Sequence, residues 1–315
     1  MLIALAPVSI FGVVIFGLPA LLNIIVAAVS AIVGESLFRL ITKQPIRAND
    51  LSAGVTGVLL ALVIPPTTPL WMTALGAIFA VIVAKEFFGG LGANIFNPAL
   101  IGRAFLVMSF PAALTTWRYP VLPVGSAFTS DIVTGATPLA ITKTAADVSA
   151  VGKSLVETGM SVSDSYWPTI KTLFLGFNSG CIGETSVFLC LASFLFLLVT
   201  RTIDWRTPVC MIGSGFLFAL LFWQDIGFAL YSVLSGGLVF GAVFMVTDYV
   251  TSPITSKGKI LFGIGAGLIT MLIRRWGIYP EGVCFSILIM NGVTPFLNKL
   301  LSKKYGYVKK GATTK

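Results

Sequence analysis

The sequence predicts an all-α integral membrane protein with about ten transmembrane helices, arranged as two inverted five-helix repeats. Three observations lead to this fold class. Only 10% of the 315 residues are charged and 56% are hydrophobic, whereas soluble domains carry about 25% charged residues. The apolar run "LPALLNIIVAAVSAIVG" (18–34) lacks the period-two alternation of a transmembrane barrel. The third observation is a similarity between the two halves of the chain.

Ten apolar segments are candidates for membrane spans. Several are shorter than the roughly 20 residues that a spanning helix needs, and several contain Gly or Pro. Short, interrupted helices often build a binding site near mid-membrane. The first segment lacks the basic start and the cleavage site of a signal peptide, and its abrupt apolar beginning suggests that a short N-terminal segment is missing. The predicted spans are 1–17, 18–41, 51–65, 70–86, 94–111, 183–200, 207–223, 227–247, 259–274 and 281–298.

Loop charges predict the orientation of these spans. The net charge is +9, and the basic residues lie between spans and in the C-terminal "KKYGYVKK". The positive-inside rule then places both termini in the cytoplasm. This pattern is typical of membrane anchoring near lipid headgroups, and it gives no support for a nucleic-acid partner. The predicted regions are a first repeat (1–111), an extracytoplasmic loop (112–182), a second repeat (183–300) and a basic cytoplasmic tail (301–315).

The two halves resemble each other at Gly, Pro and small polar positions. "LSAGVTGVLLALVIPPTTP" (51–69) is similar to "LSGGLVFGAVFMVTDYVTSP" (234–253), and 85–105 is similar to 274–296. A unit of five helices is odd, so the second copy enters the membrane inverted. Lys85 inside then corresponds to Arg274 outside, which explains why Arg274 departs from the charge rule. A site is expected at the interface of such repeats.

The predicted outer loop, at about 70 residues, far exceeds the usual connection between neighbouring helices, which indicates a function. It contains "SDIVTGATPLA" (130–140). From spacing alone, this stretch reads as a turn leading into a helix, because Asp and Thr cap helices and Gly allows tight backbone. It lacks the lysine spacing of a phosphate-binding loop, so ATP binding is not supported.

Polar residues inside the apolar segments are candidates for function, because ionisable groups at depth are costly. We predict an ion path through Asp248, Glu86, Glu184 and Glu281. Asp248 with Thr247, Thr251 and Ser252 offers hard oxygen ligands to a small cation. The alternative is that these polar groups cap helices or pair with Arg103 or Lys85. The full set is Glu35, Glu86, Asn94, Asn97, Arg103, Glu184, Asp248, Glu281, Asn291 and Asn298.

The chain has no histidine, and its four cysteines form no CxxC pair. A zinc or iron–sulfur site held by this protein alone is therefore not expected. Free cysteines usually pack as small hydrophobic side chains, so buried thiols are the expected outcome. The cysteines are Cys181, Cys190, Cys210 and Cys284.

"DIVTGAT" followed by "PLA" resembles the flavinylation motif of the family that contains the RnfD membrane subunit of the Rnf electron-transport complex and the NqrB subunit of the sodium-pumping NADH:quinone oxidoreductase. Nearly the whole chain is similar to this family, including "KEFFGGLGANIFNPALIGRAFLVMSFP" (85–111), "TDYVTSPITSKGKILFGIG" (247–265) and "YPEGVCFSILIMNGVTPF" (279–296). The resemblance implies that the Thr137 hydroxyl is esterified to the phosphate of FMN. It also implies that a flavin transferase, with FAD as donor, recognises Asp131, Thr134, Gly135 and Ala136.

By the same resemblance, the protein is a membrane subunit of a ferredoxin:NAD⁺ oxidoreductase complex in a prokaryotic plasma membrane. It would relay electrons through FMN, couple this to Na⁺ or H⁺ movement together with other Rnf subunits, and have no complete catalytic cycle alone. A noncovalent riboflavin is expected at the helix breaks near Asn94 and Asn97. Two alternatives remain open: the quinone-reductase subunit, or a flavin-free channel or solute transporter, which the inverted repeat would suit equally well.

Overall fold

The protein is all-α, as predicted, in a computed structural model that describes residues 1–45, 50–118, 134–135, 137, 139, 167–176, 178–277, 279 and 281–301. Each of the ten predicted spans contains a helix. These are α1 (Leu2–Phe16), α2 (Leu18–Ile41), α3 (Ser52–Leu62), α4 (Leu70–Ala84), α5 (Pro98–Ser109), α10 (Val187–Val199), α11 (Arg206–Trp223), α12 (Ile226–Leu234) with α13 (Leu238–Phe240) and the π-helical η4 (Gly241–Met245), α14 (Ser256–Trp276) and α15 (Val283–Leu301).

Smaller elements connect these helices. The 3₁₀ turn η2 (Glu86–Phe88) and helix α6 (Pro111–Leu114) flank α5, and α9 (Trp167–Leu175) precedes α10. Two short strands, β1 (Trp117–Arg118) and β2 (Thr134–Gly135), pair antiparallel, with Trp117 opposite Gly135. Helix α9 was not predicted, because its nine residues fall inside the segment interpreted as a loop.

Among the described residues, five helices are long and apolar enough to cross a membrane on their own: α2, α4 with η2, α11, α14 and α15. Helix α12 and the segment 238–245 pass the same test only as a pair, bent by 61° at the break between them. Helices α1, α3, α5 and α10 are apolar but shorter. Several helices in the predicted spans are therefore short or broken, as the sequence predicts, and the number of about ten membrane crossings stays a prediction.

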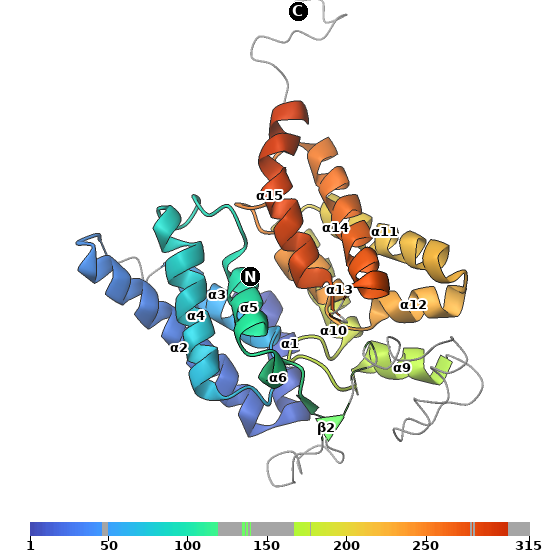
Figure 1. Ribbon diagram of the computed structural model, residues 1–315, viewed down its shortest axis with the longest axis horizontal. Coiled ribbons are helices and arrows are strands. Elements are labelled where there is room, and N and C mark those ends of the chain that lie inside the picture. The colour runs from blue at the N-terminus through green and yellow to red at the C-terminus, as the bar shows by residue number, and fades with distance from the viewer. Residues whose placement is uncertain are drawn as a thin grey trace, which may run out of the picture.

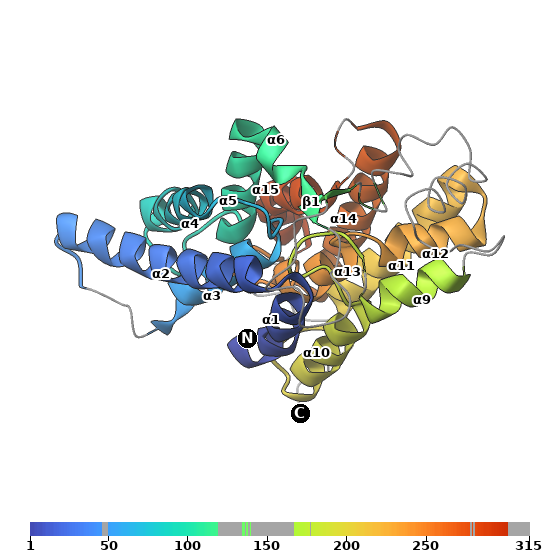
Figure 2. The ribbon, with the colours of Figure 1, turned by 90° about the horizontal axis from the view of Figure 1, so that it is seen from below.

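The helices form two groups with the same order of packing. In the first group α2 packs against α3 and α4, and α4 packs against α5; in the second α11 packs against α12 and α14, and α14 packs against α15. Figures 1 and 2 show α2 to α4 on one side of the molecule and α11, α12 and α14 on the other. Helices α5 and α15 contact each other across the interface.

Equivalent positions of the two halves also make equivalent contacts. Lys85, at the end of α4, donates from Nζ to the Ser52 hydroxyl at 2.5 Å. Arg274, near the end of α14, donates from Nη2 to the Ser235 carbonyl at 3.2 Å. The sequence comparison aligned "LSAG" (51–54) with "LSGG" (234–237) and Lys85 with Arg274. These contacts support the repeat, and its inverted orientation stays a prediction.

Helix breaks occur where "GGLGANIFNP" and "IYPEG" were expected to interrupt the chain. The first lies between α4 and α5 and the second between α14 and α15. Gly90 in the first break has φ +90°, and a Cβ there would lie 2.8 Å from Arg39 Nη2. A third break at Gly236, with φ +65°, separates α12 from α13. Left-handed backbone of this kind favours glycine.

Small residues let the helices approach closely within each group. A Cβ on Gly102 of α5 would lie 2.8 Å from the Gly76 carbonyl oxygen of α4, and one on Gly263 of α14 would lie 2.6 Å from the Thr207 carbonyl oxygen of α11. Backbone contact of this kind is the usual way in which helices associate in membranes, where burial of apolar surface provides little driving force. The tight pairs α4–α5 and α11–α14 therefore depend on their glycines.

A buried ion-pair group joins α2 to the end of α4. Lys85 Nζ lies 3.0 Å from Glu35 Oε1, and Arg39 Nη2 lies 3.1 Å from Glu86 Oε1 and 3.5 Å from Glu35 Oε1. All four side chains are at most 3% exposed. Because two cations face two carboxylates, the group is balanced in charge, which buried ions require.

A second, more exposed ion-pair group lies between α10 and α11. Asp204 accepts hydrogen bonds from the Arg206 backbone N–H and from Lys259 Nζ, both at 3.1 Å. Partial burial acts to raise the pKa of Asp204, but these bonds and the nearby cations outweigh it and hold the pKa below its ordinary value. A carboxylate with a depressed pKa stabilises the fold at neutral pH, and this contribution is lost as the pH falls through its folded-state pKa.

Asp204→Asn is therefore expected to lower the melting temperature of the detergent-solubilised protein at neutral pH. The difference from the natural protein should shrink on acidification, because the aspartate is then protonated in both states. Melting followed by intrinsic fluorescence over a pH series measures this. Substitution of the exposed Lys257 by alanine is the control, and an Asp204→Asn difference that stays constant with pH would contradict the assignment.

Candidate functional site

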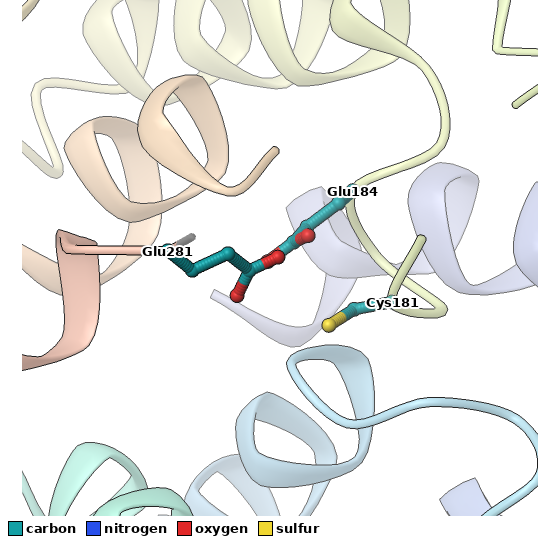
Figure 3. Close-up of side chains that lie close together, drawn as sticks. All are labelled: Cys181, Glu184 and Glu281. Atoms are coloured by element: carbon teal, nitrogen blue, oxygen red, sulfur yellow. The ribbon is translucent and has the colours of Figure 1, made fainter. Parts of the chain in front are cut away.

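Four side chains from distant parts of the sequence meet at the interface of the two halves. We name Arg103, Cys181, Glu184 and Glu281 the carboxylate cluster. Arg103 comes from α5, Cys181 and Glu184 from the segment before α10, and Glu281 from the break before α15. Arg103 Nη2 donates to the Glu281 carboxylate, and Arg103 Nη1 lies 3.6 Å from Glu184 Oε1. Figure 3 shows the two glutamates pointing toward each other with Cys181 beside them.

The segment that carries Cys181 and Glu184 is held by the unwound end of α3. Gly183 N donates to the Leu62 carbonyl at 2.7 Å, and Cys181 Sγ donates to the Val63 carbonyl at 3.1 Å. A Cβ on Gly183 would lie 2.8 Å from Leu62 Cβ, so this close approach requires glycine. These carbonyls are free to accept because α3 ends at Leu62, which shows how a broken helix builds the site.

Glu184 has few polar contacts. Neither of its carboxylate oxygens has a hydrogen-bond partner among the described residues, and the residue is 8% exposed. Its Oε1 approaches Gly237 so closely that a Cβ there would overlap it. Arg103 supplies the only ion pair of Glu184 within the part of the chain that the structure describes.

Arg274 reaches the same region from α14. Its guanidinium donates to the Ser232 carbonyl and, at 3.2 Å, to the Ser235 carbonyl at the C-terminal end of α12. It is 5% exposed. A cation at this position is stabilised by the negative end of the α12 dipole. Arg274 therefore brings a buried positive charge next to Gly236 and the carboxylate cluster.

Thr137 lies beside the carboxylate cluster. It is 4% exposed and lines a cavity of about 10 Å³ together with Glu184, Glu281 and Gly236. The strand β2, two residues before it, is paired with β1. In Figure 1, β2 and the end of α15 lie at opposite ends of the molecule. Thr134 and Gly135 form β2 itself, while Asp131 and Ala136 fall outside the described residues.

A larger cavity lies elsewhere on the interface. We name it the asparagine cavity, because Asn94 and Asn97 line it, and its volume is about 280 Å³. Asn97 caps α5, accepting from Ala99 N at 3.1 Å, and it also donates to the Met245 carbonyl at 3.4 Å. Asn94 donates to the Phe96 carbonyl at 3.2 Å. Asn97 therefore joins the break before α5 to Met245 of the second half, and Asn94 bonds within the break itself.

Asp248 lines the same cavity from the other half. It accepts hydrogen bonds from Thr251 Oγ1 at 3.0 Å and from Val250 N at 3.4 Å. Thr247 bonds instead to the Val243 carbonyl of its own helix, at 2.7 Å. The Thr247 and Thr251 hydroxyls, which the sequence predicts as cation ligands beside Asp248, thus already take part in hydrogen bonds within the protein. Further residues of the cavity wall are Asp50, Ser52, Lys85, Phe244 and Tyr249.

The predicted site residues therefore fall into two groups. Thr137, Glu184 and Glu281 meet at the carboxylate cluster, and Asn94, Asn97 and Asp248 meet at the asparagine cavity. Glu86 belongs to neither, because it pairs with Arg39. Asn291 is buried with both amide atoms unpartnered among the described residues, and Asn298 accepts from Ile254 N at 3.0 Å.

Several of the polar residues make the contacts that the alternative interpretation expects, and their part in an ion path stays a prediction. Glu35 pairs with Lys85, Glu184 and Glu281 contact Arg103, and Asn97 caps a helix. Cys181, Cys190 and Cys284 are buried free thiols, as expected, and Cys210 is partly exposed. Sequence reasoning did not place Cys181 or Arg274 at the site. The departure of Arg274 from the charge rule was the one signal that could have identified it.

Fold and site together define an α-helical membrane protein with two polar sites at the interface of two similar helix groups. The chain belongs to the NQR2, RnfD, RnfE family, whose model matches residues 1–306.

Named relatives match nearly the full chain. It is 44% identical to the D subunit of the proton-translocating ferredoxin:NAD⁺ oxidoreductase complex of Clostridium ljungdahlii, with 94% of this chain and 87% of the relative covered. It is 41% identical to the D subunit of the Na⁺-translocating ferredoxin:NAD⁺ oxidoreductase complex of Acetobacterium woodii, with 98% and 89% covered. It is 35% identical to the D subunit of the ion-translocating oxidoreductase complex of Stutzerimonas stutzeri, with 95% and 88% covered.

Proposed function

We propose that this protein is the D-type membrane subunit of a ferredoxin:NAD⁺ oxidoreductase complex that couples electron transfer to Na⁺ or H⁺ transport. The observation that carries the proposal is the near full-length similarity to the D subunits of such complexes. One of these relatives is named for protons and the other for Na⁺, so similarity alone leaves the ion open. The protein works only together with the other subunits of the complex.

We assign a covalent FMN to Thr137, as a threonyl phosphoester. Glu184 and Glu281 line the cavity of Thr137 and would repel the negative charge of a phosphoester held inside it. The cavity at Thr137, about 10 Å³, has no room for a flavin ring, so the ring would lie outside it. Because Thr137 is buried, its hydroxyl has to leave this cavity before the flavin transferase can reach it. When bound, FMN supplies the redox chemistry.

A noncovalent riboflavin suits the asparagine cavity. The volume of about 280 Å³ is close to the lower end of the usual range for ligand sites, about 300 Å³. Phe244 and Tyr249 offer apolar contact surface, and the amides of Asn94 and Asn97 offer hydrogen bonds to a heterocyclic ring. In this role the protein binds and orients the flavin.

Alanine substitutions at the two asparagines should separate flavin binding from helix capping. Asn94→Ala and Asn97→Ala are both expected to lower the amount of riboflavin that copurifies, measured by chromatography of acid extracts. Only Asn97→Ala removes an N-cap, so only this variant should also lose about 0.5–2 kcal/mol of stability. Unchanged riboflavin content in both variants would contradict the assignment.

The ion path that we propose includes Asp248 at the asparagine cavity and Glu184 and Glu281 at the carboxylate cluster. The proposed path also includes Glu86, which lies next in sequence to Lys85 in the wall of the asparagine cavity. Asp248→Asn should slow ion-coupled turnover of the complex, because the carboxylate charge that attracts a cation is lost. An unchanged rate and an unchanged Na⁺ dependence would remove Asp248 from the path.

The cellular setting follows from the same proposal. The chain would lie in a prokaryotic plasma membrane, with both termini in the cytoplasm and the flavin on the extracytoplasmic side. Figure 1 shows β2 and the C-terminal end of α15 at opposite ends of the molecule, which supports opposite sides of the membrane for the flavin and for the end of α15. Its partners would be the other Rnf subunits, membrane lipid and, during maturation, the flavin transferase.

The test of the proposed function uses the purified complex in sealed vesicles. Reduced ferredoxin should reduce NAD⁺ and drive uptake of Na⁺ or H⁺, followed with radioactive sodium and with a pH-sensitive dye. A complex that reduces quinone from NADH, with no ferredoxin-dependent NAD⁺ reduction, would identify the quinone-reductase class instead. Ion or solute passage without electron transfer would favour a channel or transporter.

A further inference from the structure

The carboxylate cluster has more acceptor oxygens than donors to satisfy them. Both oxygens of Glu184 lack a hydrogen-bond partner among the described residues, and its side chain is 2% exposed. Figure 3 shows this carboxylate aimed at that of Glu281. One ligand atom from each of Cys181, Glu184 and Glu281 lies within 4.8 Å of the other two. A buried carboxylate that has no hydrogen bond and faces a second carboxylate indicates a position for a cation, because two like charges at close range are unfavourable.

Within the described part of the chain, Arg103 is the one cation that forms ion pairs with these two carboxylates. Arg103 donates a hydrogen bond to Glu281 and lies 3.6 Å from Glu184 without bonding to it. Arg274, which approaches from α14, directs its guanidinium to the carbonyls at the end of α12. The other titratable groups around the cluster in the described part of the chain are neutral in their ordinary forms at pH 7; they are Cys181, Cys190, Tyr231, Tyr279 and Cys284.

The thiol of Cys181 limits which cation fits. Its Sγ donates to the Val63 carbonyl at 3.1 Å, a bond that needs the protonated thiol. Zinc and other thiophilic metals bind the thiolate. The remaining ligands are hard carboxylate oxygens, which suit H⁺ or Na⁺. Arg103 is the one cation ion-paired with the two glutamates among the described residues, and Arg274 is held by backbone carbonyls, so the pair has one more carboxylate than it has ion-pair partners. A single monovalent cation matches that excess.

We propose that Glu184 and Glu281 together bind one monovalent cation, H⁺ or Na⁺, and that Arg103 competes with this cation for Glu281. The inference rests on the proposed function in placing the pair on the ion path. Arg103 belongs to α5 of the first half and Glu281 precedes α15 of the second. Cation binding therefore weakens a contact that joins the halves, so occupancy of the site is linked to their relative position.

Infrared difference spectroscopy of the full chain in reconstituted membranes tests the proposal. A step from choline to Na⁺ at constant pH should change a carboxylate band if Na⁺ is the cation. A pH step should instead produce the C=O stretch of a protonated carboxyl if H⁺ is the cation. Either band should be lost in Glu184→Gln and in Glu281→Gln and retained in Glu35→Gln, a matched control at a buried glutamate outside the cluster.

Arg103→Lys keeps both carboxylates and therefore gives a result even if the glutamine variants fail to fold. Lysine makes a weaker competitor than the forked guanidinium, so half-saturation should occur at an about three- to tenfold lower cation concentration. An unshifted titration would overturn the competition. If neither Na⁺ nor a pH step changes a carboxyl band of the natural protein, the proposed cation site is wrong. Thr137→Ala, which removes the proposed flavin attachment, should keep the carboxyl band. The cation site and the flavin assignment can therefore fail independently of each other.

Discussion

Thr137→Ala is expected to abolish covalent flavin completely when the chain is expressed with its flavin transferase. The substitution removes the only oxygen that can form the phosphoester at this position, so no partial attachment there is possible. Denaturing gels viewed under ultraviolet light report bound flavin by its fluorescence. Intact-mass measurement should show the FMN adduct on the natural protein and its absence from the variant.

Two further variants make this result specific. Thr137→Ser keeps a hydroxyl and should retain fluorescence, whereas Asp131→Ala keeps Thr137 and should slow attachment by weakening recognition by the transferase. Gel filtration and melting of Thr137→Ala check that the fold is intact. Fluorescence that persists in Thr137→Ala would place the flavin on another residue and overturn the central site assignment.

Arg103→Met is expected to cause the largest loss of stability. Arg103 contacts both Glu184 and Glu281, and its side chain is only 8% exposed. Removal of the cation leaves the buried Glu184 and the largely buried Glu281 without an ion-pair partner among the described residues, and the loss of one partner of a buried pair costs about 3–5 kcal/mol. Unfolding by a denaturing detergent, followed by circular dichroism, measures the change.

A second substitution should restore part of this loss. In Arg103→Met combined with Glu281→Gln, one buried charge is removed together with its partner, so the double variant should be more stable than Arg103→Met alone. Measured additivity of the two single effects would show that the residues act independently. Arg103→Met with unchanged stability would mean that the two carboxylates are neutralised without this guanidinium.

The sequence predicts the helical segments well, because apolar runs between charged loops are a strong local signal. Boundaries are less accurate where helices break. Hydropathy predicts one span over 94–111, but the helix begins at Pro98, and the predicted span 227–247 is divided by the break at Gly236. In both cases short polar or glycine-rich stretches lie within an apolar run, and hydropathy alone does not locate the break.

The site is harder to predict, because it depends on contacts between distant residues. Arg103 and Glu281 are separated by 178 positions, and nothing local in the sequence joins them. The carboxylates were recognised as costly, and Arg103 was considered as a partner. The segment 178–182, interpreted as the end of an outer loop, instead includes buried Cys181 and Ile182. A backbone pairing with α3 places it there, and such pairing leaves no pattern in composition.

The shortness of α3 also has a consequence for biogenesis. At 11 residues it extends about 16 Å, whereas the hydrocarbon core of a bilayer is about 30 Å thick. The exposed backbone beyond its end would be unstable in lipid alone. During synthesis, α3 therefore cannot settle in the bilayer as an independent segment before the chain at 182–183, more than a hundred residues later, arrives to donate to its carbonyls. Membrane insertion of this protein is thus completed by tertiary folding. Until then, the insertion machinery has to keep the incompletely folded first half away from the lipid.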